Sequence, residues 1–252
     1  MSAGSGSVRL RLLIAYDGGA FRGWQSQADG RAVQDSLERA VASLWGERQV
    51  VHGAGRTDAG VHALGQVAHV DVPRERIPEK RWLPGLNAYL PAEVRVLKVR
   101  RVSPEFHARF GARGKRYTYR MCTGGVLPPL ELGRMWHFPC TLDLSVLRQG
   151  ADLLVGTHDF GAFAANRGKP GENTVRTVSK VAVRARGGIL TLDFEGNGFL
   201  YRMVRLMTGT LIRCARGQAP VSWIGELLEG KGRIKTSFGA PAHGLYLRQV
   251  LY

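Results

Sequence analysis

The sequence has little cysteine and no long apolar run. Its cysteines, Cys122, Cys140 and Cys214, lie too far apart to form a metal-binding pair, and they are typical of reduced thiols in a cytoplasmic protein. No apolar run approaches the roughly 18 residues that a membrane span needs. The small, polar residues 1–7 contain no signal-peptide core, and we expect them to be a disordered tail. These absences favour a cytoplasmic protein without a membrane partner.

Acidic residues are also scarce. The 252 residues include 36 basic and 20 acidic ones, which gives a formal net charge of +16 at pH 7 and a pI near 10.6. Such an excess attracts a polyanion, nucleic acid before an anionic membrane. Most of the positive charges are arginines, whose planar guanidinium suits phosphate contacts and base stacking. A genome-wide preference for arginine codons is the alternative explanation.

Cofactor and metal motifs are missing. No glycine-rich stretch ends in Gly-Lys-Ser or Gly-Lys-Thr, no complete dinucleotide-binding motif follows a strand, and no serine-centred nucleophile elbow is present. His52, His62 and His69 do not have the spacing of a common zinc site, and we expect satisfied or exposed imidazoles there. The sequence predicts a protein without cofactor or metal.

Apolar periodicity predicts one order of elements twice. For the first half we expect strands and helices at 8–16, 33–45, 48–52, 65–72, 79–90 and 94–102. For the second half we expect them at 115–122, 144–154, 175–185, 188–195, 199–214 and 244–252, with an extra helix at 221–229. Each series reads β-α-β-β-α-β.

This order is typical of the ferredoxin-like arrangement, in which helices cover one face of an antiparallel sheet. The predicted fold class is therefore α+β, with two ferredoxin-like halves flanking a positively charged cleft. We expect an N-terminal half over residues 8–106 and a C-terminal half over 107–252, joined near Ser103-Pro104.

The loop Gly53-Ala-Gly-Arg-Thr-Asp-Ala-Gly-Val-His-Ala-Leu-Gly is the most informative segment. It places a carboxylate, Asp58, two residues after a guanidinium, Arg56, where glycines allow the backbone to approach a ligand closely. A nearby arginine keeps a nucleophilic carboxylate ionised. An isolated loop aspartate is more often a turn former, and that interpretation competes with a catalytic one.

Two residues of the second half are further candidates. Arg205 ends a largely apolar helical run, so it either needs a buried partner, such as Asp58, or lies at the helix rim with its head in water. Tyr117 lies on a predicted strand, where a packing role is usual, although in a cleft it could stack on a base.

At these residues the chain resembles the TruA family of tRNA pseudouridine synthases. Residues 55–63 reproduce the family's loop Gly-Arg-Thr-Asp-Ala-Gly-Val-His-Ala. Further similar segments lie along the chain, at residues 17–25, 86–91, 106–109, 115–119, 156–160, 174–177, 203–205 and 244–247. The resemblance therefore spans residues 8 to 252.

The resemblance implies an enzyme that isomerises uridine to pseudouridine at positions 38 to 40, in the anticodon stem-loop of tRNA, without a cofactor. It implies that Asp58 is the catalytic aspartate and that Arg56 holds the flipped nucleotide. Tyr117 is similar to the tyrosine that stacks on the target uracil, Arg205 to the arginine that pairs with the aspartate, and Leu245 to an apolar pocket wall. Family members are homodimers.

Two other functions stay open. A non-catalytic RNA-binding protein of this fold would explain the charge but not the Arg56-Thr57-Asp58 sequence. A related synthase acting on other RNAs would share the whole site. Residues 164–173 form a long polar loop that varies among such enzymes, and it bears on which substrates are reached.

Overall fold

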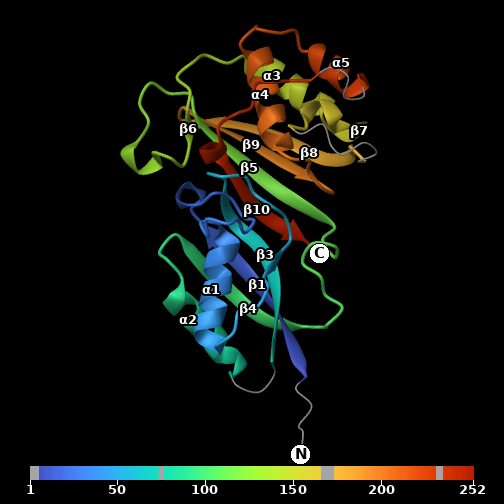
Figure 1. Cartoon of the computed structure of the whole chain (residues 1–252). Helices are drawn as coiled ribbons and strands as arrows, with labels where there is room; N and C mark the ends of the chain where they lie inside the picture. Colours follow the sequence, from blue (N-terminus) through green and yellow to red (C-terminus); the bar gives the residue numbers. More distant parts are fainter. Residues whose placement is uncertain (1–5, 74–76, 166–172, 231–234) are drawn as a thin grey trace, which may run out of the picture. The chain divides into compact units, whose positions relative to one another are not determined.

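The computed structural model describes residues 6–73, 77–165, 173–230 and 235–252 (Figure 1). The chain divides into two compact units. Unit 1 comprises Met1–Ala112 together with Leu247–Tyr252, and unit 2 comprises Arg113–Tyr246. Most of the polar loop at 164–173, and residues 1–5 of the expected tail, lie outside the described residues.

Unit 1 contains the predicted series of elements. In chain order these are β1 (Ser7–Tyr16), α1 (Val33–Trp45), β2 (His52–Gly53), β3 (His62–Pro73), α2 (Glu79–Tyr89) and β4 (Val94–Val102). β1 is central and antiparallel to both β3 and β4, and β2 pairs with β3. The predicted second strand lies later than expected and is only two residues long.

Alternation along β1 builds the core of unit 1. Leu10, Leu12 and Ile14 are at most 1% exposed, because a strand points every second side chain to the same face. Helices α1 and α2 cover the sheet (Figure 1), and α1 buries Val33, Leu37 and Val41 at helical spacing. Gly46 ends α1 with a left-handed φ of 101°, a conformation that glycine adopts without steric cost.

Unit 2 begins with β5 (Gly114–Cys122), β6 (Trp136–His137), α3 (Leu144–Leu153) and β7 (Gly156–Asp159). β8 (Val175–Arg186), β9 (Ile189–Gly196), α4 (Met203–Ala215) and α5 (Trp223–Glu229) follow. The strands are ordered β5-β9-β8-β7 with antiparallel pairing, and β6 pairs with β5 in parallel. β10 (Leu245–Leu251) starts in unit 2 and ends in unit 1.

The structure corrects two element predictions in unit 2. The helix expected at 199–214 begins only at Met203, because Arg202 adopts a left-handed conformation with φ 59° that no helix can continue through. The short strands β6 and β7 were not predicted, since two and four residues give too little periodicity to recognise. The mixed α+β class with mostly antiparallel strands is confirmed.

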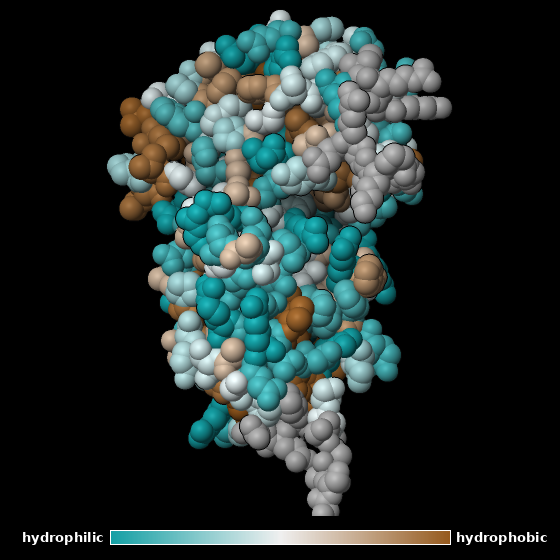
Figure 2. Space-filling view, viewed as in Figure 1, coloured by the Kyte–Doolittle hydropathy of each residue, from teal (hydrophilic) through white to brown (hydrophobic). Residues whose placement is uncertain are grey.

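Surface hydropathy is uneven in unit 2. The connection between β5 and β6 exposes three large apolar side chains, Val126 (83%), Leu130 (85%) and Leu132 (74%), and apolar atoms gather there in Figure 2. No helix among the described residues is long and apolar enough to cross a bilayer.

Candidate active site

The glycine-rich loop lies in unit 1 between β2 and β3, and its backbone is tied on both sides of Asp58. The Thr57 carbonyl accepts a hydrogen bond from the Trp24 amide at 3.1 Å, and the Asp58 carbonyl accepts one from the Val61 amide at 3.1 Å. The buried Thr57 hydroxyl lies 2.8 Å from the Tyr16 phenol. Asp58 itself is half-buried. The loop is therefore anchored while its carboxylate remains partly accessible.

The Tyr16 phenol reinforces this anchor. Tyr16 is the last residue of β1, and burial raises the pKa of its phenol to about 12, although hydrogen bonds to Thr57 and Gln66 act in the opposite direction. The phenol therefore stays neutral at physiological pH and keeps its hydrogen bond to Thr57. Gln66 also donates to the Gly55 carbonyl at 2.8 Å, which fixes the start of the loop.

Glycines of the preceding segment allow it to pack directly on the loop. A Cβ on Gly18 would lie 2.0 Å from the Val61 carbonyl oxygen. Gly23 has φ 95°, and a Cβ there would lie 2.7 Å from the Thr57 carbonyl oxygen. Both positions exclude a side chain, so residues 17–25 act as a support for the candidate catalytic loop.

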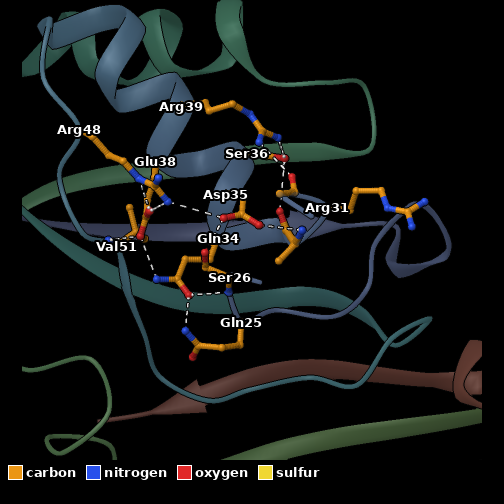
Figure 3. A network of polar contacts seen from close by, with 12 residues as sticks. Gln25, Ser26, Arg31, Gln34, Asp35, Ser36, Glu38, Arg39, Arg48 and Val51 are labelled. Carbon is orange, nitrogen blue, oxygen red and sulfur yellow. Dashed lines mark hydrogen bonds and ion pairs between the residues drawn. The ribbon is translucent and has the colours of Figure 1, made fainter. Parts of the chain in front are cut away.

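Arg56 is exposed and is held by a relay of side-chain amides. Its Nε donates to Gln25 Oε1 at 2.9 Å, Gln25 Nε2 donates to Gln34 Oε1 at 2.9 Å, and Gln34 Nε2 donates to Glu38 Oε1 at 2.8 Å. Glu38 is only 3% exposed, and it also accepts from the Val51 amide and from Arg48. Figure 3 shows this network reaching α1 from the loop at Gln25.

Sequence reasoning missed the relay. Gln34 and Glu38 are one helical turn apart and point inward, on a helix whose pattern predicted only an apolar buried face. The available signal was the segment at 17–25, which ends in Gln25 and which the family resemblance already included.

Tyr117 lies in unit 2 on β5. It faces Phe194 of β9 across the strand pair and is 7% exposed. The Phe199 ring packs edge-on against it, with ring centroids 5.2 Å apart. These contacts fix the plane of the phenol ring, which a stacking residue requires.

Arg205 is in the first turn of α4 in unit 2. Its Nε donates to the Ala240 carbonyl at 2.8 Å, and the Ala240 amide donates back to the Arg205 carbonyl at 3.0 Å. Tyr119, whose side chain is fully buried, donates its hydroxyl to the Pro241 carbonyl at 2.8 Å. Burial raises the pKa of the Tyr119 phenol well above its ordinary value, against the opposing charge of Arg205.

Leu245 follows this packed group in the chain. It is 5% exposed at the start of β10, directly after Gly244, where a Cβ would lie 2.6 Å from the Tyr119 ring. The structure thus groups Tyr119, Arg205 and the segment 240–244 within unit 2, with Leu245 directly after it. Arg56 and Asp58 belong to unit 1, and the pairing of Asp58 with Arg205 stays a prediction.

The histidines make structural contacts in unit 1. The His62 Nδ1 lies 3.0 Å from the Gly18 amide and 3.2 Å from Asp17 Oδ1. His52 and His69 stack with centroids 4.9 Å apart. In the described part of the chain, no three His, Cys, Asp or Glu residues are grouped as a metal site.

Comparisons with known proteins identify the class of enzyme that contains these features. A family model described as tRNA pseudouridine synthase matches residues 12–111 and 151–252. These ranges include Arg56, Asp58, Arg205 and Leu245, whereas Tyr117 lies between them. The chain belongs to the family of tRNA pseudouridine synthases.

Three curated relatives are similar over nearly the full chain, and each is called tRNA pseudouridine synthase A. The Akkermansia muciniphila protein is 45% identical, with 97% of this chain and 95% of the relative covered. The Methylacidiphilum infernorum protein is 43% identical, with coverages of 97% and 96%. A Streptococcus thermophilus protein is 40% identical, with coverages of 97% and 99%.

Proposed function

We propose that this chain acts on the anticodon stem-loop of tRNA, at positions 38 to 40, with Asp58 as its catalytic carboxylate. Membership of the family makes it an isomerase that converts uridine in tRNA to pseudouridine. In this reaction the N-glycosidic bond breaks, uracil turns, and C5 bonds to the ribose C1′. The C5 proton leaves and N1 gains one, so the product has the composition of the substrate.

The assignment of Asp58 as the catalytic carboxylate is supported by the anchored backbone of the loop that contains it. Hydrogen bonds to the backbone carbonyls of Thr57 and Asp58 hold the loop that bears the carboxylate in place before substrate arrives. A fixed anion beside a C1′ that develops positive character lowers the barrier to bond cleavage, as in glycoside hydrolysis. Attack on C1′, addition to uracil, and proton abstraction leading to a glycal are three routes that this carboxylate can serve.

We assign Arg56 to holding the flipped nucleotide. Chemistry at both N1 and C5 requires the base to leave the stack. The exposed Arg56 side chain, tied through Gln25 to the buried Gln34 and Glu38, is a pre-positioned cation that can occupy the vacated space.

Unit 2 supplies the remaining proposed contacts. We propose that Tyr117 stacks on the uracil, that Arg205 pairs with Asp58, and that Leu245 forms an apolar wall. Their fixed side chains support these roles, because each one is packed or hydrogen-bonded within its own unit. We also propose that the two units are ferredoxin-like halves flanking a positively charged cleft. The order β4-β1-β3 with β2 beside β3 supports this for unit 1.

We propose a homodimer, carried by the exposed Val126, Leu130 and Leu132 on the β5–β6 connection. Exposed apolar groups of this kind are typical of protein interfaces. Sedimentation velocity tests the proposal: a single monomeric species at micromolar concentration would refute it.

We further propose a cytoplasmic location, where tRNA is available, and recovery of a tagged chain only with membranes would contradict it.

Substitution of Asp58 tests the central proposal. Asp58→Asn keeps the shape and removes the charge, and we expect pseudouridine formation to fall below detection while the Kd for tRNA changes less than about threefold. Glu47→Gln, which removes an exposed carboxylate elsewhere in unit 1, is the matched control and should retain full activity. Retained turnover in Asp58→Asn would refute the assignment.

Pseudouridine mapping in cells that lack and regain the gene tests the target. Restoration at positions 38 to 40 of tRNA is the expected result. Restoration in another RNA would favour the related synthase, and tRNA binding with no restored pseudouridine would favour a non-catalytic RNA-binding protein.

A further inference from the structure

A hollow of about 700 Å³ opens in unit 2 beside the C-terminal part of α4. Its lining includes two arginines, two phenylalanines and two neutral polar residues: Arg213, Arg216, Phe138, Phe238, Gln218 and Ser237. This volume lies within the range of roughly 300–1,000 Å³ that is usual for small-ligand sites. None of the residues proposed for the chemistry at uridine lines it.

The charge in this hollow is entirely positive. The Arg216 guanidinium lies over the Phe138 ring, 5.3 Å from its centroid, and Arg213 lies equally far over the Trp223 ring. Neither arginine forms an ion pair with a carboxylate within the described residues. Stacking on a ring fixes a guanidinium in position and leaves its N–H groups available to an anion.

The aromatic side of the hollow packs on the half-buried Trp136 and on helix α4. Phe138 is half-buried and Phe238 is 39% exposed, and both pack on Trp136 with ring centroids 4.7 and 6.3 Å away. The Phe238 carbonyl rests against Gly209 of α4, where a Cβ would lie 1.9 Å from it. Both rings are therefore held in place before any ligand binds.

The same segment connects the hollow to Arg205. Ala240, two residues after Phe238, exchanges hydrogen bonds with Arg205 through its backbone, and the buried Thr236 hydroxyl bonds to Thr210 at 3.0 Å. Along α4, Arg213 is eight residues from Arg205, about 12 Å at the helical rise. A short stretch of RNA spans that length.

We propose that this hollow binds one unpaired nucleotide of the RNA substrate, away from the uridine that is isomerised. The base stacks on Phe238, because the Arg216 guanidinium already lies over the Phe138 ring, and Arg213 and Arg216 bind the adjoining phosphate. Aromatic faces combined with cations are the usual means of holding unpaired nucleotides. The inference rests on the proposed function in taking tRNA as the substrate.

Photocrosslinking tests the nucleotide site directly. Anticodon stem-loops carrying 5-iodouridine at one unpaired position at a time are irradiated with the full-length protein, and crosslinked peptides are identified by mass spectrometry. We expect one position to crosslink to Phe238 or Phe138. If none of the labelled positions crosslinked to Phe138 or Phe238, and all crosslinks fell on other residues, the proposal would be overturned.

Binding of the same stem-loop to variants provides a second measurement. Phe238→Ala should raise its Kd about tenfold, and Phe238→Tyr, which keeps an aromatic face, should restore it. Arg216→Ala should weaken binding and reduce the slope of log Kd against log salt by about 0.7 to 0.9. Arg148→Ala, which removes an exposed arginine of α3, is the charge-matched control and should change neither.

Thermal unfolding of each variant shows whether the fold is kept, and Arg216→Ala tests the site even if Phe238→Ala does not fold. Pseudouridine formation by the wild type is measured on the same RNA. Turnover with unchanged Kd in the Arg216 and Phe238 variants would overturn the nucleotide site alone. Crosslinks to Phe238 without any turnover would instead refute the proposed function and leave the nucleotide site standing.

Discussion

Arg56 illustrates how a single exposed residue can be positioned from a distance. Its Nε hydrogen bond to Gln25 is the first of a series that ends on Glu38, inside the core of unit 1. The Glu38 carboxylate is satisfied by the Val51 amide and by Arg48, so it does not move to meet a new partner. An arginine restrained in this way loses less side-chain entropy when it binds RNA.

This geometry predicts that Gln25→Ala impairs catalysis more than it impairs stability or RNA binding. We expect kcat to fall about tenfold, because the loss of one positioning contact displaces Arg56 without removing its charge. The Kd for tRNA should stay within about twofold of the wild-type value. Single-turnover pseudouridine formation and filter binding measure the two quantities.

Gln27→Ala is the control for this prediction. Gln27 lies two residues away, and its Nε2 donates to the Arg22 carbonyl at 3.0 Å, outside the relay. If both variants lost activity equally, or if Gln25→Ala changed only the Kd, Arg56 would not depend on the relay.

At the scale of single residues, the sequence alone identified the residues of the catalytic motif but not the side chains that hold them in position. Arg56 and Asp58 were selected by the loop and by the family resemblance. Gln34 and Glu38 could not be selected, because a buried polar pair is visible only when its partners from 25 and 51 are placed beside the helix. Hydrogen bonds between distant segments leave no local signal in the sequence.

Strand β3 places one imidazole, His69, in the core of unit 1 beside the exposed His52 and the half-buried His107. His69 is 2% exposed, and it contacts His52 of β2 and His107, whose ring centroids are 4.9 and 4.7 Å away. Its Nδ1 accepts a hydrogen bond from the Ala108 amide at 3.2 Å. Arg9 and Asp71, which pair with each other, are charged groups close to it, and Arg11 lies opposite it on β1.

Burial, and then the charges of Arg9, His107 and His52, lower the pKa of His69 to about 4, while Asp71 opposes the shift. An unfolded histidine titrates near 6.5, so between these values the unfolded chain binds the additional proton. The free energy of unfolding should therefore fall as the pH drops from about 6.5 to about 4. The contribution of His69 has a maximum slope of about 1.4 kcal/mol per pH unit.

His69→Asn should remove that slope, because asparagine can accept the Ala108 hydrogen bond but does not titrate. Urea unfolding at several pH values between 4 and 7.5 measures it. His137→Asn, which replaces an exposed imidazole of unit 2, should leave the pH dependence unchanged. If the stability of His69→Asn depended on pH as strongly as that of the wild type, a group other than His69 would be responsible for the pH dependence.

Among the elements, long periodic segments were predictable and their ends were not. The apolar spacing of α1 and the alternation of β1 both located real elements. The start of α4 depends on one left-handed residue, Arg202, which has no glycine to signal it. β2 and β7 are so short that pairing with a neighbouring strand, and not local pattern, determines them.

For the whole molecule, the last strand shows that a local sequence pattern does not specify which strand a segment pairs with. β10 was predicted as a strand and is one, yet Leu247–Tyr252 belong to unit 1 while Leu245 and Tyr246 belong to unit 2. Alternation specifies that a segment is extended, but the neighbour with which it pairs is a property of the complete chain. The division into two domains at residues 8–106 and 107–252 therefore stays a prediction.

The net charge of +16 leads to the prediction that belongs to the whole molecule. If the excess arginines contact RNA phosphates, each contact releases bound counterions, and log Kd rises linearly with log salt. We expect the Kd for tRNA to rise at least about 100-fold between roughly 50 and 200 mM salt, as several phosphate contacts require. Filter binding across that range measures the slope, and thermal unfolding at both ends checks that the protein stays folded. A nearly flat response would mean that the arginines reflect codon preference, and that affinity for tRNA comes from the site contacts alone.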